Sequence, residues 1–117
     1  MGDTANNRLR LVMVSTGAVT TLAGSGSAAF ADGTGTGASF NNPRGISYSP
    51  YGTVVAVAEY NNHRIRLVVV STGEVTTIAG SGTAAFADGV TLASCVAATR
   101  TRRSKRRVYI RVYCVTG

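Results

Sequence analysis

Apolar and polar residues alternate along several short stretches of the chain. Near the start, Leu9, Leu11 and Met13 alternate with arginines, which is typical of a strand with one buried face. A Ser-Thr-Gly turn follows, and the chain then returns as a second strand, so this segment predicts a β-hairpin. The strands expected from such patterns span residues 8–14, 19–23, 46–48, 53–58, 64–70 and 75–79.

The hairpin pattern occurs twice. Residues 6–33 align with residues 62–89 at a period of 56, and six of the 28 aligned positions differ, which leaves 22 identities. A repeat this close indicates one supersecondary unit that is present twice. Residues 44–80 contain four expected strands and therefore predict a complete antiparallel meander, whereas residues 4–23 contain only the last two strands of such a unit.

A connection rich in Gly, Ser and Asn joins the two units. It spans residues 24–43, which is long for a loop in a compact domain. We expect Phe30 and Phe40 to anchor it against the sheet, because they are the large apolar side chains within it. A turn then forms at Pro50 and Tyr51, where the proline sets φ at the first corner.

The segment from Phe40 to Val68 resembles an NHL repeat, the blade unit of a family of β-propellers. The resemblance covers residues 3–89 and implies four-stranded antiparallel blades arranged radially. Asp3 matches an acidic position of the family pattern, at which the second copy has Glu59, and Tyr51 replaces the Asp or Asn usual in its turn. The matching motif residues, for which the resemblance implies a structural role, are Asn42, Pro43, Gly45, Asn62, His63, Arg64 and Ile65.

The resemblance divides the chain into blades and connections. We expect an all-β fold of NHL-like blades that form an incomplete propeller, followed by an irregular basic C-terminal tail. The expected parts are the second half of a blade (1–23), an interblade loop (24–43), a complete blade (44–80), a loop that turns into non-repeat sequence (81–99) and the basic tail (100–117).

About one and a half blades cannot close a propeller, which needs at least about four. We expect the apolar faces of Ile65, Leu67, Val55 and Val57 to lie bare on one side of the complete blade. Such a chain is a piece of a longer protein, the product of a mispredicted gene, or a unit that associates with copies of itself. Its partners are therefore further blades, another protein or a second copy.

The net charge of +7 comes from the tail. Residues 1–99 contain five arginines and five acidic residues, whereas residues 100–117 contain six arginines, Lys105 and no acid. The repeat also stops within one residue of Gly89, which favours a change of reading frame there over gradual divergence. On that interpretation, the tail is an out-of-frame segment that was not selected for binding.

The alternative is that the tail binds phosphates or nucleic acid. Tyr109 and Tyr113 would then stack on bases, and the alternation over residues 108–115 also permits a strand. The candidate contacts are Arg100, Arg102, Arg103, Lys105, Arg106 and Arg107. Nucleic acid is expected as a partner through this tail alone.

The sequence shows no catalytic constellation, and we predict no catalytic, cofactor-binding or metal-binding residue. His63 is the single histidine, and Cys95 and Cys114 both lie outside the repeats. Some related propellers are metal-dependent lactonases or lyases with sites on the central axis. In the complete blade, Arg44, Ser47 and Ser49 stand at the corresponding positions, and these are poor metal ligands.

We therefore expect a non-catalytic NHL-repeat β-propeller fragment that forms a binding scaffold within a larger protein. The alternatives are a fragment of a propeller enzyme, lactonase-like or lyase-like, and nucleic-acid binding through the tail. The sequence contains no run of 18 apolar residues, so no membrane span is predicted. It does not indicate a cellular compartment.

Overall fold

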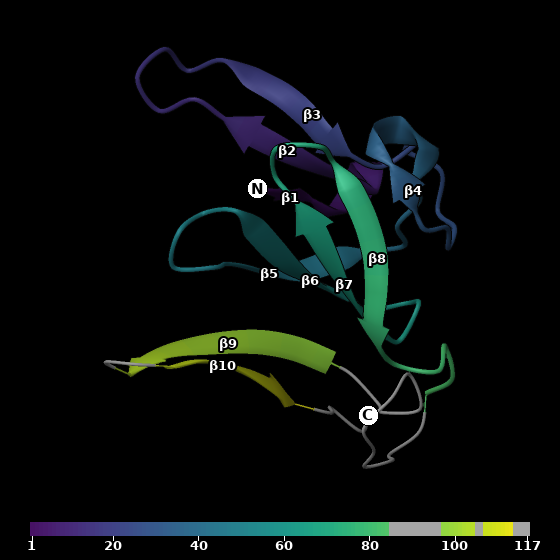
Figure 1. The fold of residues 1–117 in the computed structure, drawn as a ribbon. Helices are drawn as coiled ribbons and strands as arrows, with labels where there is room; N and C mark the ends of the chain where they lie inside the picture. The colour runs from purple at the N-terminus through teal and green to yellow at the C-terminus, as the bar shows by residue number, and fades with distance from the viewer. Residues whose placement is uncertain (85–96, 105–106, 114–117) are drawn as a thin grey trace.

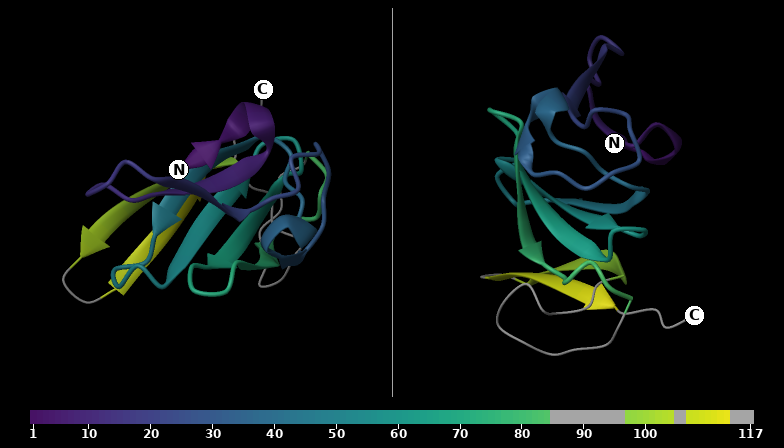
Figure 2. Two further views of the ribbon diagram at one scale, coloured as in Figure 1. Left: turned by 90° about the horizontal axis from the view of Figure 1, so that it is seen from above. Right: turned by 90° about the vertical axis from the view of Figure 1, so that its right-hand side faces the viewer.

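A computed structural model describes residues 1–84, 97–104 and 107–113 of the chain. The described residues form three antiparallel sheets that lie one above another (Figure 1). An N-terminal sheet is stacked on a central five-stranded sheet, and a C-terminal hairpin lies on the opposite side, as the side view in Figure 2 also shows. The all-β fold of antiparallel propeller blades is confirmed.

The central sheet contains the complete blade. Its strands are β5 (Pro43–Tyr48), β6 (Val54–Glu59), β7 (Arg64–Val69) and β8 (Glu74–Ala79), each paired with the next along the chain. The register of β6 and β7 is continuous, from Val54 opposite Val69 to Glu59 opposite Arg64. Four strands were predicted here, and β5 begins three residues earlier than expected, at Pro43.

The N-terminal sheet is the second half of another blade. It contains β2 (Arg8–Val12) and β3 (Val19–Ala23), joined by a turn in which Gly17 has φ +73°. A two-residue strand, β1 (Gly2–Asp3), pairs with β2 and was not predicted; the one-turn helix η1 (Thr4–Asn6) connects them. Leu9 is buried as expected, but Met13 lies beyond the end of β2 and is exposed.

The core lies between these two sheets. Leu9, Leu22 and Ala23 of the N-terminal sheet pack with four valines of the complete blade. Those valines alternate with residues of the opposite face, because successive side chains in a strand point to opposite faces. The four core valines are Val55, Val57, Val68 and Val75.

The expectation of a bare apolar side is wrong for three of its four residues. Val55 and Val57 are buried against the N-terminal sheet, and Ile65 is buried on the other face of the blade with Ala58. Leu67 is only partly buried. Cross-strand register explains the split, because Val57 lies opposite Arg66 and Ala58 opposite Ile65. The four residues therefore belong to two faces, and the half-blade covers one of them.

The interblade loop contains more structure than its composition indicates. Strand β4 (Gly33–Thr34) pairs with Val75 and Glu74 at the edge of β8, so it is the fifth strand of the central sheet. The one-turn helix η2 (Gly35–Gly37) follows it. Phe40 is fully buried, as expected of an anchor, whereas Phe30 keeps 42% of its surface exposed. Only one of the two expected anchors therefore enters the core.

The described part of the tail is a hairpin rather than irregular chain. Strands β9 (Ala97–Ser104) and β10 (Arg107–Tyr113) pair in antiparallel register, from Arg107 opposite Ser104 to Val112 opposite Thr99. The part of the expected strand 108–115 that the structure describes, residues 108–113, does lie in a strand. Strand β9 lies against β5 and β6 (Figure 1). Cys95 and Cys114 lie outside the described residues.

Within the described residues, no helix combines the length and the apolar character that a bilayer crossing requires.

The two phenylalanines of the loop give a matched stability test. Phe40→Ala should lower the free energy of unfolding by about 3–5 kcal/mol, because it leaves a cavity at a fully buried position. Phe30→Ala should cost about 1 kcal/mol, since Phe30 is half exposed and contributes mainly its contact with arginine. Urea denaturation followed by circular dichroism measures both, and equal losses would contradict the assigned positions.

Candidate functional site: the junction between the blades

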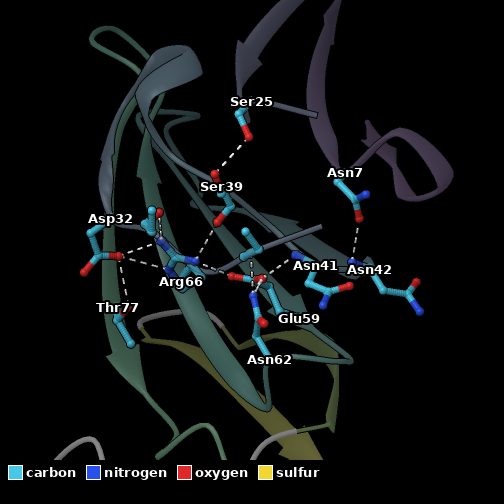
Figure 3. Close-up of polar contacts among 12 residues, drawn as sticks. Asn7, Ser25, Asp32, Ser39, Asn41, Asn42, Glu59, Asn62, Arg66 and Thr77 are labelled. Carbon is cyan, nitrogen blue, oxygen red and sulfur yellow. Dashed lines mark hydrogen bonds and ion pairs between the residues drawn. The ribbon is translucent and has the colours of Figure 1, made fainter. Parts of the chain in front are cut away.

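Two charged residues are buried inside the complete blade. Glu59 is the last residue of β6, and Arg66 lies in the middle of β7. Both side chains are fully inaccessible to solvent. A buried charge must be paired and hydrogen-bonded to be tolerated, so the neighbours of these two residues define the polar site of the fold (Figure 3).

The carboxylate of Glu59 accepts hydrogen bonds from three sides. The backbone N–H of Asn41 donates to Oε2 over 2.8 Å, Nδ2 of Asn62 donates to the same oxygen, and Nη1 of Arg66 donates to Oε1. Burial raises the pKa of Glu59 above its ordinary value, while the Asn41 hydrogen bond and the charge of Arg66 act in the opposite direction. The carboxylate thus connects the end of the interblade loop, the turn before β7 and β7 itself.

All five N–H donors of the Arg66 guanidinium are engaged. Nε donates to Oδ1 of Asp32 over 3.1 Å, and Nη2 donates to the same oxygen over 2.6 Å. Nη2 also donates to the carbonyl of Ala31 over 2.7 Å, and Nη1 to the carbonyl of Ser39 over 3.3 Å. The bond from Nη1 to Glu59 is the fifth, so all five donors of the guanidinium are used.

Aromatic rings of the loop complete the surroundings of Arg66. Its Cζ lies 4.8 Å from the ring centroid of Phe30 and 5.3 Å from that of Phe40. Both distances are within the range of cation–π attraction. The ring centroid of Phe30 also lies 3.7 Å from Cζ of Arg64. The arginines of β7 therefore hold the loop by charge, hydrogen bonds and ring contacts together.

Asp32 fastens the interblade loop to the complete blade. Besides its two bonds from Arg66, its Oδ1 accepts a hydrogen bond from Oγ1 of Thr77 on β8 over 2.9 Å. The Asp-Gly pair was predicted only as a turn. Glu59, Arg66 and Asp32 were not predicted as a site, although the placement of Glu59 and Arg66 in apolar strands was a usable signal.

The first group of motif residues lies where the loop enters β5. Asn42 has φ +59°, its N–H donates to Oδ1 of Asn7 over 2.9 Å, and its carbonyl accepts from the N–H of Tyr60. Pro43 is buried, and its carbonyl accepts from Oγ1 of Thr4 over 2.7 Å. Gly45 follows a register shift in the pairing of β5 with β6. This group joins the two blades.

The second group lies in the turn before β7. Asn62 donates to the carbonyl of Ala29 over 3.0 Å as well as to Glu59. His63 has φ +49°, and Asn7, its equivalent in the first copy, has φ +51°. Arg64 donates to the carbonyl of Ser81 over 3.3 Å, as Arg8 does to Ser25 in the first copy. Ile65 is buried.

The structure does not bring the tail residues to this junction. Arg100, Arg102 and Arg103 belong to β9, and Arg107 is the first residue of β10. Lys105 and Arg106 lie outside the described residues. Phosphate or nucleic-acid contact through the tail stays a prediction. Among the described residues, no group of three or more His, Cys, Asp or Glu side chains has a geometry suited to a metal ion.

The two copies contain a matched pair of arginines for a stability test. Arg66→Ala should lower the free energy of unfolding by about 3–5 kcal/mol, because it leaves Glu59 buried without its counter-charge. Arg10 is the equivalent residue of the first copy, but it is only partly buried and donates to Oγ1 of Thr21. Arg10→Ala should therefore change stability by less than about 0.5 kcal/mol. If urea denaturation gave similar losses of stability for the two variants, the stabilising role assigned to the contacts of Arg66 would be contradicted.

The position of His63 can be tested by two substitutions. His63→Val should cost about 1–2 kcal/mol of stability, because a β-branched residue is disfavoured at positive φ. His63→Asn should leave stability within about 0.5 kcal/mol, since Asn tolerates this region and stands at the equivalent position 7. Thermal unfolding of both variants checks the prediction, and a large loss in His63→Asn would mean that the imidazole itself is required.

Comparison with known proteins gives one sequence relative. The chain is 34% identical over 76 residues to NHL repeat-containing protein 2 from Bos taurus; the match covers 64% of this chain and 10% of the relative. The chain thus spans about a tenth of the length of this relative. No family model matches the chain.

Comparison with solved structures supports the fold. The crystal structure of an auxiliary nutrient binding protein from Bacteroides thetaiotaomicron superposes with a TM-score of 0.57 at 20% identity. The match covers 81% of this chain and 27% of that protein. At this identity the likeness concerns the fold alone, and nutrient binding is a description of that protein. The repeat, its motif residues, the sheet order and the bovine relative agree: this chain carries about one and a half NHL repeats, folded as β-propeller blades.

Proposed function

We propose that this chain is a non-catalytic interaction scaffold, a set of propeller blades that binds further blades or another protein. The proposal rests on one observation: the charged side chains inside the blade bind one another and the interblade loop. Glu59, Arg66 and Asp32 have the functional groups that an enzyme would use for acid–base chemistry or substrate binding. Here they hold the interblade loop in place, and every donor of Arg66 is already engaged.

Two of the three side chains at the positions considered for an axial site, Arg44 and Ser49, also have structural partners. Oγ of Ser49 accepts hydrogen bonds from the N–H groups of Thr53 and Val54, over 3.1 and 3.2 Å, within the turn between β5 and β6. Arg44 lies 4.5 Å from the ring centroid of Tyr60 and donates to Oδ1 of Asn42. These contacts favour a scaffold over a propeller enzyme of the lactonase or lyase type.

A metal test separates the two functions. We expect the purified full-length chain to retain less than about 0.1 equivalent of calcium or zinc after dialysis. We also expect EDTA to leave its Tm unchanged within about 1 °C, since a metal that bound the native state would raise stability by mass action. Elemental analysis and thermal unfolding measure these quantities.

One stoichiometric metal ion, together with a lower Tm in EDTA, would contradict the scaffold proposal and favour the enzyme. Apo-chain reloaded with calcium, with zinc or with magnesium serves as the control for loss of metal during purification.

A further inference from the structure

Strand pairing divides the C-terminal hairpin of β9 and β10 into two faces. Residues directly opposite each other in an antiparallel pair share a face, and successive residues of a strand alternate between faces. One face contains three such pairs: Arg100 with Arg111, Arg102 with Tyr109, and Ser104 with Arg107. We call it the cationic face, since it contains four of the six arginines of the tail.

The other face of the hairpin is mostly apolar. It contains three pairs, each with an aliphatic residue of β10: Thr99 with Val112, Thr101 with Ile110, and Arg103 with Val108. The run of arginines in β9 is therefore split between the two faces. The sequence alone treated Arg102 and Arg103 as equivalent candidates, whereas the register separates them.

The complete blade has an apolar surface on the side where the hairpin lies (Figure 2). Strand β9 lies against β5 and β6, and on this side of the blade Ala56, Ala58 and Ile65 are only 3%, 3% and 1% exposed. Arginines buried over these apolar residues would lose their hydration without compensation, whereas the apolar face can pack there. A hairpin that covers the blade therefore needs its apolar face inward, and this leaves the cationic face toward solvent.

The cationic face carries charge that the tail does not balance. Arg100 and Arg111 are directly opposite each other, and like charges at such positions repel. Arg102 and Arg107 lie further along the same face, and residues 90–117 contain no Asp or Glu. From Arg107 to Arg111 the charge extends over about 14 Å of strand. An anion with charges at intervals along its length, such as a phosphodiester backbone, would relieve this repulsion.

Tyr109 indicates which kind of polyanion fits the cationic face. It lies in the middle of that face, opposite Arg102 and two residues from both Arg107 and Arg111. An aromatic residue among cations is the arrangement with which proteins bind single-stranded nucleic acid, because bases stack on the ring while the cations follow the backbone. Polyphosphate has no bases, and the bases of a duplex are already stacked on one another.

We propose that the cationic face of the hairpin binds single-stranded nucleic acid, with phosphates on its four arginines and a base stacked on Tyr109. This activity goes beyond the scaffold function and does not depend on it, since the blade needs only to hold the hairpin. It differs from binding by an unfolded basic tail, in which every arginine would contribute alike. The face adds Arg111 to the contacts expected from the sequence, and it leaves out Arg103.

Fluorescence anisotropy of the full chain with a labelled single-stranded oligonucleotide of about 12 nucleotides tests the proposal. We expect binding that weakens as salt rises, with a slope of roughly −2 to −3 in log K against log salt, because three or four phosphates contribute about 0.7 each. Arg102→Gln should weaken binding about fivefold at about 50 mM salt and make the slope shallower by about 0.7.

Arg103→Gln is the matched control, because it removes the same charge from the neighbouring residue on the other face. It should bind within about twofold of the parent. Equal losses in the two variants would show an unstructured polycation and overturn the proposal, and so would a parent chain without salt-dependent binding. If Arg102→Gln loses its circular dichroism spectrum, Arg111→Gln replaces it, since Arg111 lies on the same face.

Two substitutions of Tyr109 test the stacking. Tyr109→Phe should keep the affinity, because the ring remains, whereas Tyr109→Leu should lower it about fivefold or more without changing the salt slope. Unlabelled duplex and inorganic polyphosphate, at equal charge concentration, should compete less well than the unlabelled single strand. Equal competition by either, or full affinity in Tyr109→Leu, would contradict the assignment to single strands. A chain that binds neither nucleic acid nor metal would leave the scaffold function standing.

Discussion

The placement of Arg66 is the constraint on which the rest of this structure depends. A guanidinium in the middle of a buried strand costs several kcal/mol of desolvation unless all its donors are satisfied. The acceptors come from three places: Glu59 at the end of β6, Asp32 in the interblade loop, and loop carbonyls at Ala31 and Ser39. Because most of them belong to the loop, the complete blade can bury its arginine only when the loop is folded against it.

This requirement explains why a long connection can be ordered. A Gly-rich loop of twenty residues loses much backbone entropy when it is fixed. It is held at three kinds of points: β4 adds to the edge of β8, Phe40 enters the core, and Asp32 binds Arg66. The polar contacts set the position of the loop, and the apolar contacts contribute most of the stability. The connection between blades is therefore part of their interface.

The sequence was sufficient to predict the six strands of the repeats, their turns and the period, because these depend on local alternation and on glycines at turns. It did not predict the two-residue strands β1 and β4. It was not sufficient to predict which faces would be covered. Val57 and Ile65 are both apolar strand residues, and only the pairing register shows that they point to opposite sides. The bond from Arg66 to Asp32 joins residues 34 positions apart, which no local pattern reveals. The hairpin of the tail was foreseen only in its second strand, since β9 is rich in arginine and has no apolar alternation.

The two copies also show how much of a blade interface is generic and how much is specific. A row of valines on a sheet face packs against almost any apolar surface, and it does not fix how far one sheet slides over another. A guanidinium that donates five hydrogen bonds does fix the position of what it binds, because a small shift breaks several of these bonds at once. Buried ion pairs often contribute little net stability compared with apolar residues. We therefore infer that the Glu59–Arg66–Asp32 junction fixes the position of the interblade loop on the complete blade, while the valines contribute the apolar packing between the two sheets.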